Sequence, residues 1–221
     1  MSITDLWNLL TESQRNFLVE HIKIHVYRKS EPIYNELDDP TYLMCLLSGK
    51  VKVFKDGAGH RNQIIRTIKE LGFFGYRAAF VGEKYQTGAS AIERSVVCLI
   101  PVKVMITLIK ENTNVAIYFI KQLATMLGEA DTLTVSLTQK HIRARLAESL
   151  VNLKDKYGVE EDGSTLSVYL SREDMACLSN MTTSNAIRTL SAFASEHLIA
   201  IDGRKIKIIA DTELRKISQM G

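Results

Sequence analysis

Residues 171–209 have the sequence SREDMACLSNMTTSNAIRTLSAFASEHLIAIDGRKIKII, which predicts two short helices followed by a charged β-hairpin. Ser171 with Asp174 three residues later is typical of a capped helix start, and a short apolar face follows it. A second helix start falls at Thr182 or Thr183. Helix, turn, helix and hairpin in this order predict a winged helix-turn-helix.

The second of these helices is predicted to have two different faces. Ala186, Leu190 and Phe193 recur at four- and three-residue spacing and therefore share one face. The other face is small, polar and cationic: Thr183, Ser184, Ile187, Arg188 and Ser191. Such a face suits the major groove of DNA, whereas a small α+β unit with a solvated charged turn is the alternative.

The hairpin supports the winged helix-turn-helix. Leu198–Ile201 and Ile206–Ile209 are β-rich runs on either side of Asp202 and Gly203, a pair that tolerates the positive φ angles of a type I′ turn. Three cations are then expected at or near the tip of the wing: Arg204, Lys205 and Lys207.

Composition places the chain among ordinary soluble globular proteins. Its 221 residues are 46% hydrophobic and 24% charged, with enough length for two small domains. From residue 138 onward, 12 Lys and Arg stand against 11 Asp and Glu, so we expect modest non-specific DNA affinity. No run approaches the roughly 20 apolar residues of a membrane span, and no signal peptide is evident. We therefore expect a cytoplasmic protein that does not contact membranes.

Cysteine usage fits a reducing compartment. Cys45, Cys98 and Cys177 are far apart and lie in apolar or helical surroundings, which predicts reduced thiols rather than disulfides. A cysteine-ligated iron–sulfur cluster is thereby disfavoured.

Enzyme and metal chemistry find little support. His21 and His25 are four residues apart, but the alternation of Ile22, Ile24 and Val26 predicts a strand with both histidines on its polar face and no third ligand. The strand region also lacks the His-x-His and following Glu of a metal-dependent cupin enzyme. We expect no catalytic residues, no metal and no cofactor. A sensing module without DNA binding would leave the helix-turn-helix pattern unexplained.

The amino-terminal half predicts short helices and then many strands. One or two amphipathic helices are expected before residue 23. From about residue 24, short segments broken by Gly and Asp every eight to twelve residues predict an antiparallel β-roll or barrel. The predicted strands are Ile24–Tyr27, Tyr42–Leu47, Lys50–Lys55, Gln63–Ile68 and Val96–Ile100. The glycine-bearing stretch 72–88 is expected to connect the last two.

A long amphipathic helix is expected after the β-roll. Its narrow apolar seam has alternating three- and four-residue spacing: Ala116, Phe119 or Ile120, Leu123, Met126 or Leu127, Ala130, Leu133 and Leu137. Such a seam can be buried against the β-roll, against a partner copy, or against both, and a coiled-coil dimer is the simplest solution. A core helix of a single domain is the alternative.

These patterns divide the chain into three parts. We expect an effector-sensing β-roll domain at 1–110, a dimerisation helix at 111–137 and a winged helix-turn-helix DNA-binding domain at 138–221. An amphipathic run and a short strand open the last domain: Ile142, Leu146, Leu150, Leu153, then Leu166–Leu170.

Four strings carry a resemblance to a known family. They are PIYNELDDPTYLMCLLSGKVKVFK (32–55), ELGFFGYRAAF (70–80), RARLAESLVNL (143–153) and SREDMACLSNMTTSNAIRTL (171–190). Over nearly its whole length the chain resembles bacterial transcription factors of the cyclic-AMP receptor protein and fumarate-nitrate regulator family. The resemblance implies an α+β fold in which a cyclic-nucleotide-binding-like β-roll, a double-stranded β-helix or jelly roll, is joined by a long dimerisation helix to a winged helix-turn-helix. It further implies a homodimer on palindromic double-stranded DNA and allows RNA polymerase as a partner.

The resemblance also implies a DNA-contacting set. The family's base-reading positions fall on Thr183, Ser184 and Arg188, and its phosphate contacts fall on Arg172, Thr182 and Asn185. A guanidinium can bond guanine O6 and N7 bidentately, so Arg188 is the strongest candidate. Ser184 replaces the family's usual Glu, which predicts a different or more relaxed base preference. In the alternative, the threonines are only N-caps and Arg172 is a solvated first-turn residue.

The effector region departs from the family. Nucleotide-binding members carry Gly-Glu and an Arg before a small residue, and here Gly75-Tyr76 and Tyr85-Gln86-Thr87 stand at these places, so both groups that hold a cyclic nucleotide are missing. The expected pocket comprises Gly72, Gly75, Tyr76, Arg77, Tyr85, Gln86, Thr87 and Asp131, with Met126 and Ala130 beside it. We expect an unidentified small-molecule effector other than cyclic AMP, or a pocket closed by Tyr76 and Tyr85. The alternative is a cyclic-nucleotide-responsive regulator that holds the phosphate with Arg77.

Overall fold

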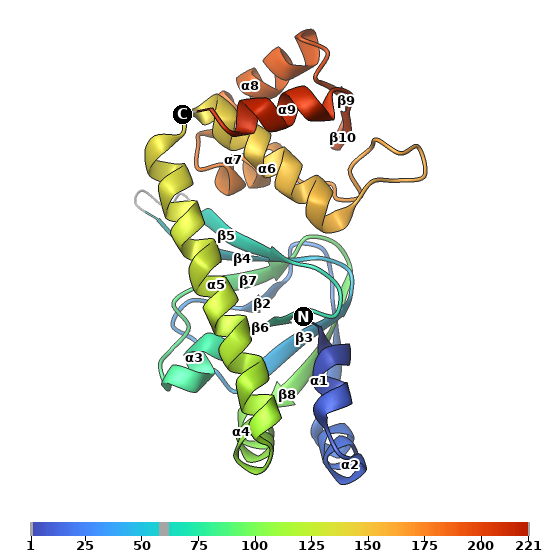
Figure 1. Ribbon diagram of the computed structural model, residues 1–221, viewed down its shortest axis with the longest axis vertical. Coiled ribbons are helices and arrows are strands. Elements are labelled where there is room, and N and C mark those ends of the chain that lie inside the picture. The colour runs from blue at the N-terminus through green and yellow to red at the C-terminus, as the bar shows by residue number, and fades with distance from the viewer. Residues whose placement is uncertain (1, 58–61, 221) are drawn as a thin grey trace. The chain divides into compact units, whose positions relative to one another are not determined.

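The computed structural model describes residues 2–57 and 62–220 (Figure 1). The chain separates into two compact units. The first comprises residues 1–60 and 65–129, and the second comprises residues 61–64 and 130–221. Each unit is described by itself below. Among the described helices, none is long and apolar enough to cross a membrane.

Two four-stranded sheets form the β-roll of the first unit. The first sheet has the order β1-β8-β3-β6 and the second has the order β2-β7-β4-β5. The strands are β1 (Lys23–Tyr27), β2 (Pro32–Tyr34), β3 (Tyr42–Ser48), β4 (Val51–Lys55), β5 (Gln63–Ile68), β6 (Phe73–Phe74), β7 (Gly88–Ala91) and β8 (Ser95–Pro101). Neighbours such as β3 and β8 pair antiparallel. The predicted β-roll is therefore confirmed.

Strand β3 is apolar on both faces because both faces are covered. Met44 and Leu46 belong to the core inside the roll. Leu43 and Cys45 belong to a second core, between the first sheet and the helices. A strand buried on both sides reads as a continuous apolar run, as this one does.

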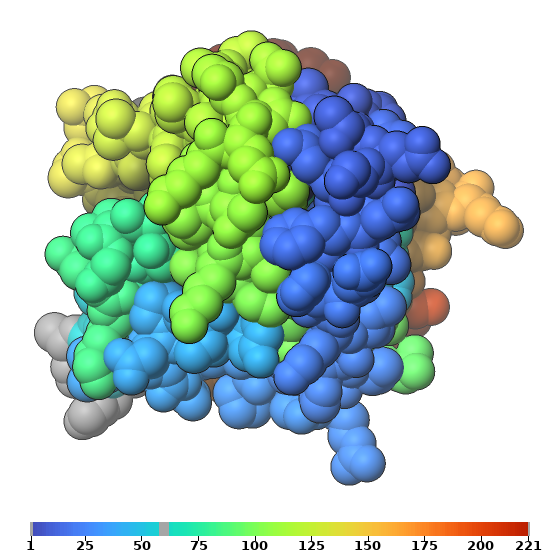
Figure 2. Space-filling view, turned by 90° about the horizontal axis from the view of Figure 1, so that it is seen from below, coloured from blue at the N-terminus to red at the C-terminus, as the bar shows by residue number. Residues whose placement is uncertain are grey.

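The helices of the first unit pack on the first sheet. They are α1 (Ile3–Leu9), α2 (Glu12–His21), α3 (Tyr76–Val81), α4 (Val102–Glu111) and the first part of α5 (Thr113–Gln139). Capping boxes start α1 at Ser2 and α2 at Thr11, and each side chain accepts from a backbone N–H three residues on. Figure 2 shows the blue amino-terminal helices against the green segment that contains α4.

Several details of the first unit differ from the sequence prediction. The stretch 72–88 is not a plain connection, because it holds β6 and α3; Gly75 starts α3 at a φ of +77°. Strands β2 and β7 were also missed. The predicted alternation from Ile22 to Val26 is wrong: His21 is the last residue of α2, and in β1 Ile24 is 62% exposed. Val26 is 44% exposed as well, so Ile24 and Val26 do not form a buried apolar face of β1.

Helix α5 carries two apolar stripes rather than one seam. Phe119, Leu123 and Met126 pack into the core of the first unit. Ile120 and Leu127 are 58% and 65% exposed. The predicted seam left Phe119 or Ile120, and Met126 or Leu127, as alternatives, and the structure divides them: Phe119 and Met126 face the core, whereas Ile120 and Leu127 are exposed. The helix runs from Thr113 to Gln139, whereas the sequence predicted 111–137.

The second unit is helical with one hairpin. Its elements are α6 (Ile142–Tyr157), α7 (Arg172–Leu178), α8 (Thr183–Ser195), β9 (Ile199–Asp202), β10 (Lys205–Ile208) and α9 (Asp211–Ser218). The predicted apolar face of α6 is buried at Leu146, Leu150 and Leu153. The strand predicted at Leu166–Leu170 does not form, because only isolated bridges join Leu166 to Val159 and Thr165 to Lys207.

Candidate nucleic-acid interface

Helix α8 has the two faces that its sequence predicts. Thr182 is the N-cap, and its hydroxyl accepts a hydrogen bond from the Asn185 backbone N–H at 3.2 Å. Ala186, Leu190 and Phe193 are fully buried. The opposite face is exposed at Thr183, Ser184, Ile187, Arg188 and Ser191. Burial of Ala186, Leu190 and Phe193 therefore fixes the orientation of α8, so that its polar face points to solvent.

The turn between α7 and α8 is held from α6. Arg145 donates to the backbone oxygens of Ser179 and Asn180 at 3.1 and 3.0 Å. It also donates to the backbone oxygens of Leu137 and Lys140, each at 3.3 Å. Asn180 has a φ of +49°, a conformation that needs support in a residue with a side chain. A single guanidinium thus joins the end of α5 to the turn that orients α8.

The candidate base-reading arginine is pre-oriented. The Arg188 Nη2–H donates to Asn185 Oδ1 at 2.5 Å, one turn earlier on α8. Both side chains lie on the side of the helix away from the core, and Arg188 is exposed. Asn185, which the resemblance assigned to a phosphate, is here the residue that positions Arg188.

The wing turn is shifted by one residue from the prediction. Asp202 pairs with Lys205, so Gly203 and Arg204 form the two-residue turn. Gly203 has a φ of +55° and Arg204 does not have a positive φ. A type I′ turn needs a positive φ at both central residues, so the predicted turn type is wrong.

Arg172 is bound to the wing. Its Nη2–H donates to the backbone oxygen of Gly203 at 2.7 Å, while Nη1 is buried without a partner. The start of α7 is therefore tied to the wing turn, and the interpretation of Arg172 as a merely solvated residue is wrong.

Asp162 anchors the base of the wing. Its carboxylate accepts hydrogen bonds from the backbone N–H groups of Ser164 and Thr165 and from the Thr165 hydroxyl, all within 3.0 Å. These bonds hold the pKa of Asp162 well below its usual range. The carboxylate also lies 3.5 Å from the ammonium of Lys207 on β10.

Ion pairing decides where positive charge remains on the second unit. Six of its cations pair with carboxylates: Lys140, Arg143, Lys154, Lys207, Arg215 and Lys216. Among the described residues, no carboxylate pairs with Arg188, Arg204 or Lys205. Exposed positive charge without a carboxylate partner therefore remains on α8 and the wing, whereas Arg145 and Arg172 direct their guanidinium groups to backbone oxygens.

The predicted effector residues line a filled roll. The Tyr85 ring stacks on Tyr34 with centroids 3.9 Å apart, and its hydroxyl donates to the Tyr42 backbone oxygen at 3.2 Å. A Cβ at Gly75 would lie 2.2 Å from Met44 Cε, so Met44 occupies the space above this glycine. Burial raises the pKa of the Tyr85 phenol well above its usual range.

The remaining effector candidates do not converge. Tyr76 is buried and its hydroxyl donates to Met126 Sδ at 2.8 Å. Gln86 is exposed and bonds Glu83, and Gly72 contacts Lys69 in a turn. Asp131 is exposed on α5, four residues after Leu127 on the exposed stripe.

Two further effector candidates, Arg77 and Thr87, interact with Tyr34, whose side chain belongs to the core inside the roll. A hydrogen bond with Thr87 and the charges of Arg66 and Arg77 partly offset the burial that raises the pKa of Tyr34. The sequence prediction missed Tyr34, Met44 and Arg66. Tyr34 and Met44 stand in the quoted string 32–55, but only the fold brings Met44 to Gly75 and Tyr34 to Tyr85.

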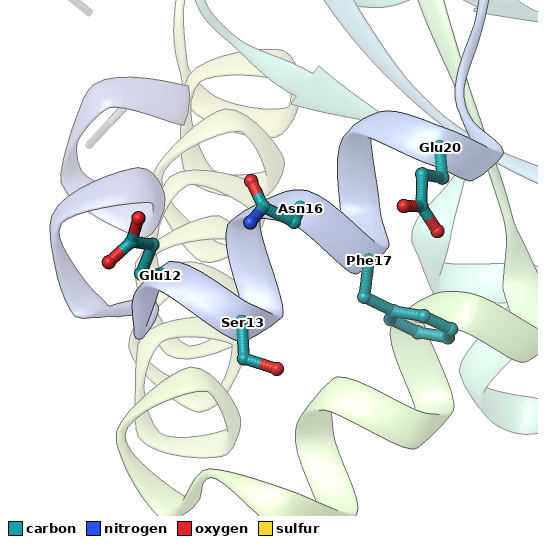
Figure 3. A pocket seen from close by; sticks show the side chains of 5 residues that line it. All are labelled: Glu12, Ser13, Asn16, Phe17 and Glu20. Atoms are coloured by element: carbon teal, nitrogen blue, oxygen red, sulfur yellow. The ribbon is translucent and has the colours of Figure 1, made fainter.

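One hollow on the surface of the first unit lies along helix α2. It is lined by residues that follow one another along one helix: Glu12, Ser13, Asn16, Phe17 and Glu20 (Figure 3). Two carboxylates and no cation line it. Within the described residues, no group of three or more His, Cys, Asp or Glu could hold a metal ion.

A β-roll and a winged helix-turn-helix with an exposed recognition face define a DNA-binding regulator. Comparison with family models supports both halves. Residues 24–112 match the cyclic nucleotide-binding domain, and residues 144–217 match the Crp-like helix-turn-helix domain. The chain belongs to the cyclic-AMP receptor protein and fumarate-nitrate regulator family of bacterial transcription regulators, which are not enzymes.

Individual relatives are distant but cover most of the chain. The global nitrogen regulator of Nostoc sp. is 21% identical over 84% of this chain and 84% of its own length. The cAMP-activated global transcriptional regulator CRP of Pasteurella multocida is 21% identical over 87% and 92%. The structure of FixK2 from Bradyrhizobium japonicum superposes with a TM-score of 0.81 at 22% identity, covering 90% of this chain and 98% of that one.

Proposed function

We propose that this chain acts as a homodimer that reads palindromic double-stranded DNA through α8. The observation that carries the proposal is the exposed face of α8, where Arg188 is unpaired by any described carboxylate and is held by Asn185. A guanidinium in this position can bond guanine O6 and N7. Ser184 and Thr183 offer hydroxyls to neighbouring base edges.

The phosphate contacts belong to the wing and to the start of α8. Arg204 in the wing turn and Lys205 at the start of β10 are both exposed, and both can make salt-sensitive phosphate contacts. Thr182 is the N-cap of α8 and therefore lies at the amino end of the helix, where the backbone N–H groups favour a phosphate. Arg172 donates a hydrogen bond to the Gly203 backbone oxygen, so its role in DNA binding is to position the wing beside α7.

The exposed stripe of α5 supports the homodimer. Ile117, Ile120, Ala124 and Leu127 are all exposed at three- and four-residue spacing. This is the spacing of the a and d positions of a coiled coil. Two copies packed along it would bury side chains that one chain leaves in water.

The β-roll interior argues against cyclic AMP as the effector. Tyr85 stacked on Tyr34 and Met44 above Gly75 fill the inside of the roll. A buried cyclic phosphate would need a paired cation or a full set of N–H donors. Arg66 and Arg77 lie close enough to Tyr34 for their charges to act on its phenol, so a phosphate held by Arg77 is the alternative. Because the side chains of Tyr34, Met44 and Tyr85 occupy the interior, our proposal is an effector that does not place a phosphate inside the roll.

Selection from randomised DNA tests the DNA-binding proposal. Purified protein is incubated with duplexes that carry a randomised 30-base-pair core, and bound duplexes are amplified and sequenced over several rounds. The proposal predicts an enriched inverted repeat with guanine in each half-site. A final pool as random as the first would refute sequence-specific binding.

Calorimetry with cyclic AMP and cyclic GMP tests the effector proposal. Neither nucleotide is expected to produce binding heat at micromolar concentration. Micromolar affinity that Arg77→Ala abolishes would instead establish the alternative, in which Arg77 supplies the cation for the phosphate. Arg94→Ala is the matched control, because Arg94 lies in the same unit outside the pocket set.

A further inference from the structure

One large aliphatic side chain lies on the otherwise polar face of α8. The structure describes every residue of this helix, and its exposed residues are Thr183, Ser184, Ile187, Arg188, Ser191 and Ser195. Ile187 is 47% exposed, whereas the apolar Leu190 and Phe193 of the same helix are fully buried. Ile187 is therefore not part of the core that anchors α8.

The neighbours of Ile187 leave it as the bulkiest apolar group of this face. Ser184 lies three residues before it and Ser191 four residues after it, so both share its stripe. Their side chains are small. A β-branched side chain has essentially one χ1 rotamer in a helix, so its methyl groups are presented in a fixed direction.

The base edges of the major groove offer one apolar partner to such a group. Thymine carries a C5-methyl group there, whereas the other edge groups are hydrogen-bond donors and acceptors. Arg188 follows Ile187 directly and is held in place by Asn185. Both side chains lie on the exposed side of α8, so a helix that places this side in the major groove with Arg188 at a guanine also places Ile187 towards the base edges.

We propose that Ile187 reads the C5-methyl group of one thymine in each half-site, close to the base pair that Arg188 reads. This inference rests on the proposed function and names a chemical feature of the DNA that this site recognises. The isoleucine is a specificity determinant, because only a base with a 5-methyl group can bury its exposed side chain.

Deoxyuridine substitution tests this assignment. The selected duplex is synthesised with each thymine replaced in turn by deoxyuridine, which removes the methyl group and keeps the base pair. Dissociation constants are measured for the wild type and for Ile187→Ala. The wild type should bind about fourfold more weakly at one position per half-site, the effect of losing one buried methyl group.

The variants separate this contact from general effects. Ile187→Ala should bind the thymine duplex more weakly and show no uracil penalty at that position. Its fold is not at risk, because the side chain is exposed and alanine favours helix. Ile209→Ala truncates an isoleucine that is 54% exposed in the same unit outside α8, and it should retain the full penalty.

Two results would overturn the inference alone. One is a wild type that binds all thymine and deoxyuridine duplexes equally. The other is an Ile187→Ala protein that keeps the whole penalty, which would assign the methyl contact to another side chain such as Thr183. A wild type that does not distinguish the selected duplex from a scrambled one would overturn the proposed function and this inference with it.

Discussion

Arg188 and Arg204 are both exposed cations of the second unit, but their positions give them different roles. Arg188 lies on the exposed side of α8, which we propose faces the major groove, and it is hydrogen-bonded to Asn185. Arg204 occupies the wing turn. A side chain that reaches base edges discriminates sequences, whereas one that reaches phosphates contributes equally to all of them.

Arg188→Ala should cost about 1 to 3 kcal/mol per half-site and relax the preference at one base pair. Equilibrium binding to the selected site and to each single-base variant measures both effects. Arg204→Ala is the matched control, which should weaken all duplexes alike and reduce the salt slope by about 1. Undiminished base preference in Arg188→Ala would remove this residue from the reading set.

Two buried thiols, Cys45 and Cys98, should make the free energy of unfolding fall at alkaline pH. Burial raises the pKa of Cys45 to about 12 and that of Cys98 to about 11, from a usual value of 9.0. Because the folded-state pKa is the higher one, the stabilisation is complete below pH 9 and is lost as the pH rises towards these values.

Urea unfolding between pH 8 and pH 10.5 should therefore show a falling free energy of unfolding. Each thiol contributes at most about 1.4 kcal/mol per pH unit above its unfolded pKa. Buried tyrosines add to the fall, so the informative quantity is the difference from Cys45→Ala, whose slope should be shallower. Equal slopes for the two proteins would contradict the assignment of this pH dependence to Cys45.

At the level of elements, the two stripes of α5 have different consequences. Leu127 is exposed, whereas Leu123 packs against the core of the first unit. A carboxylate at an exposed position is harmless in a monomer and costly in a buried dimer interface.

Leu127→Asp should therefore convert dimers to monomers while the thermal unfolding midpoint of the monomer is retained. Leu123→Asp should instead destabilise the fold, because it buries a carboxylate without a partner. Val19→Asp places the same charge at an exposed position on α2 and should change neither property. Sedimentation velocity and thermal unfolding separate the three outcomes, and a Leu127→Asp dimer as stable as the wild type would refute this interface.

Elements with strong local patterns could be predicted from the sequence. The faces of α8 follow from Ala186, Leu190 and Phe193, and the apolar runs of β3 and β8 identify these strands directly. Short elements could not be predicted, because β2 and β6 have three and two residues. Helix α3 could not be predicted because its N-cap is Gly75. This residue has a positive φ and offers no side chain to cap the helix, so the usual sequence signal of a helix start is absent.

Tertiary contacts account for the other differences. Helical spacing alone cannot tell a stripe that faces the chain's own core from one that faces a second copy, so the predicted seam of α5 left residues of both as alternatives. The wing turn was misplaced by one residue because Asp202 continues the strand register to Lys205. At the candidate site, sequence reasoning found Arg188 but not its contact with Asn185, nor the bond from Arg172 to Gly203.

In the whole molecule, reading of palindromic DNA requires two copies of α8 related by twofold symmetry. Such a dimer binds half-sites about one helical turn apart, that is 10 to 10.5 base pairs between centres. Its affinity depends on the spacing, because each inserted base pair rotates one half-site about the DNA axis.

The most direct test of this claim is the affinity of the protein for selected duplexes whose half-sites are separated by zero or five additional base pairs. Five additional base pairs turn one half-site to the opposite side of the DNA helix, so we expect the affinity to fall to that of a single half-site. Equal affinity for the two duplexes would contradict a symmetric dimer that reads DNA through α8.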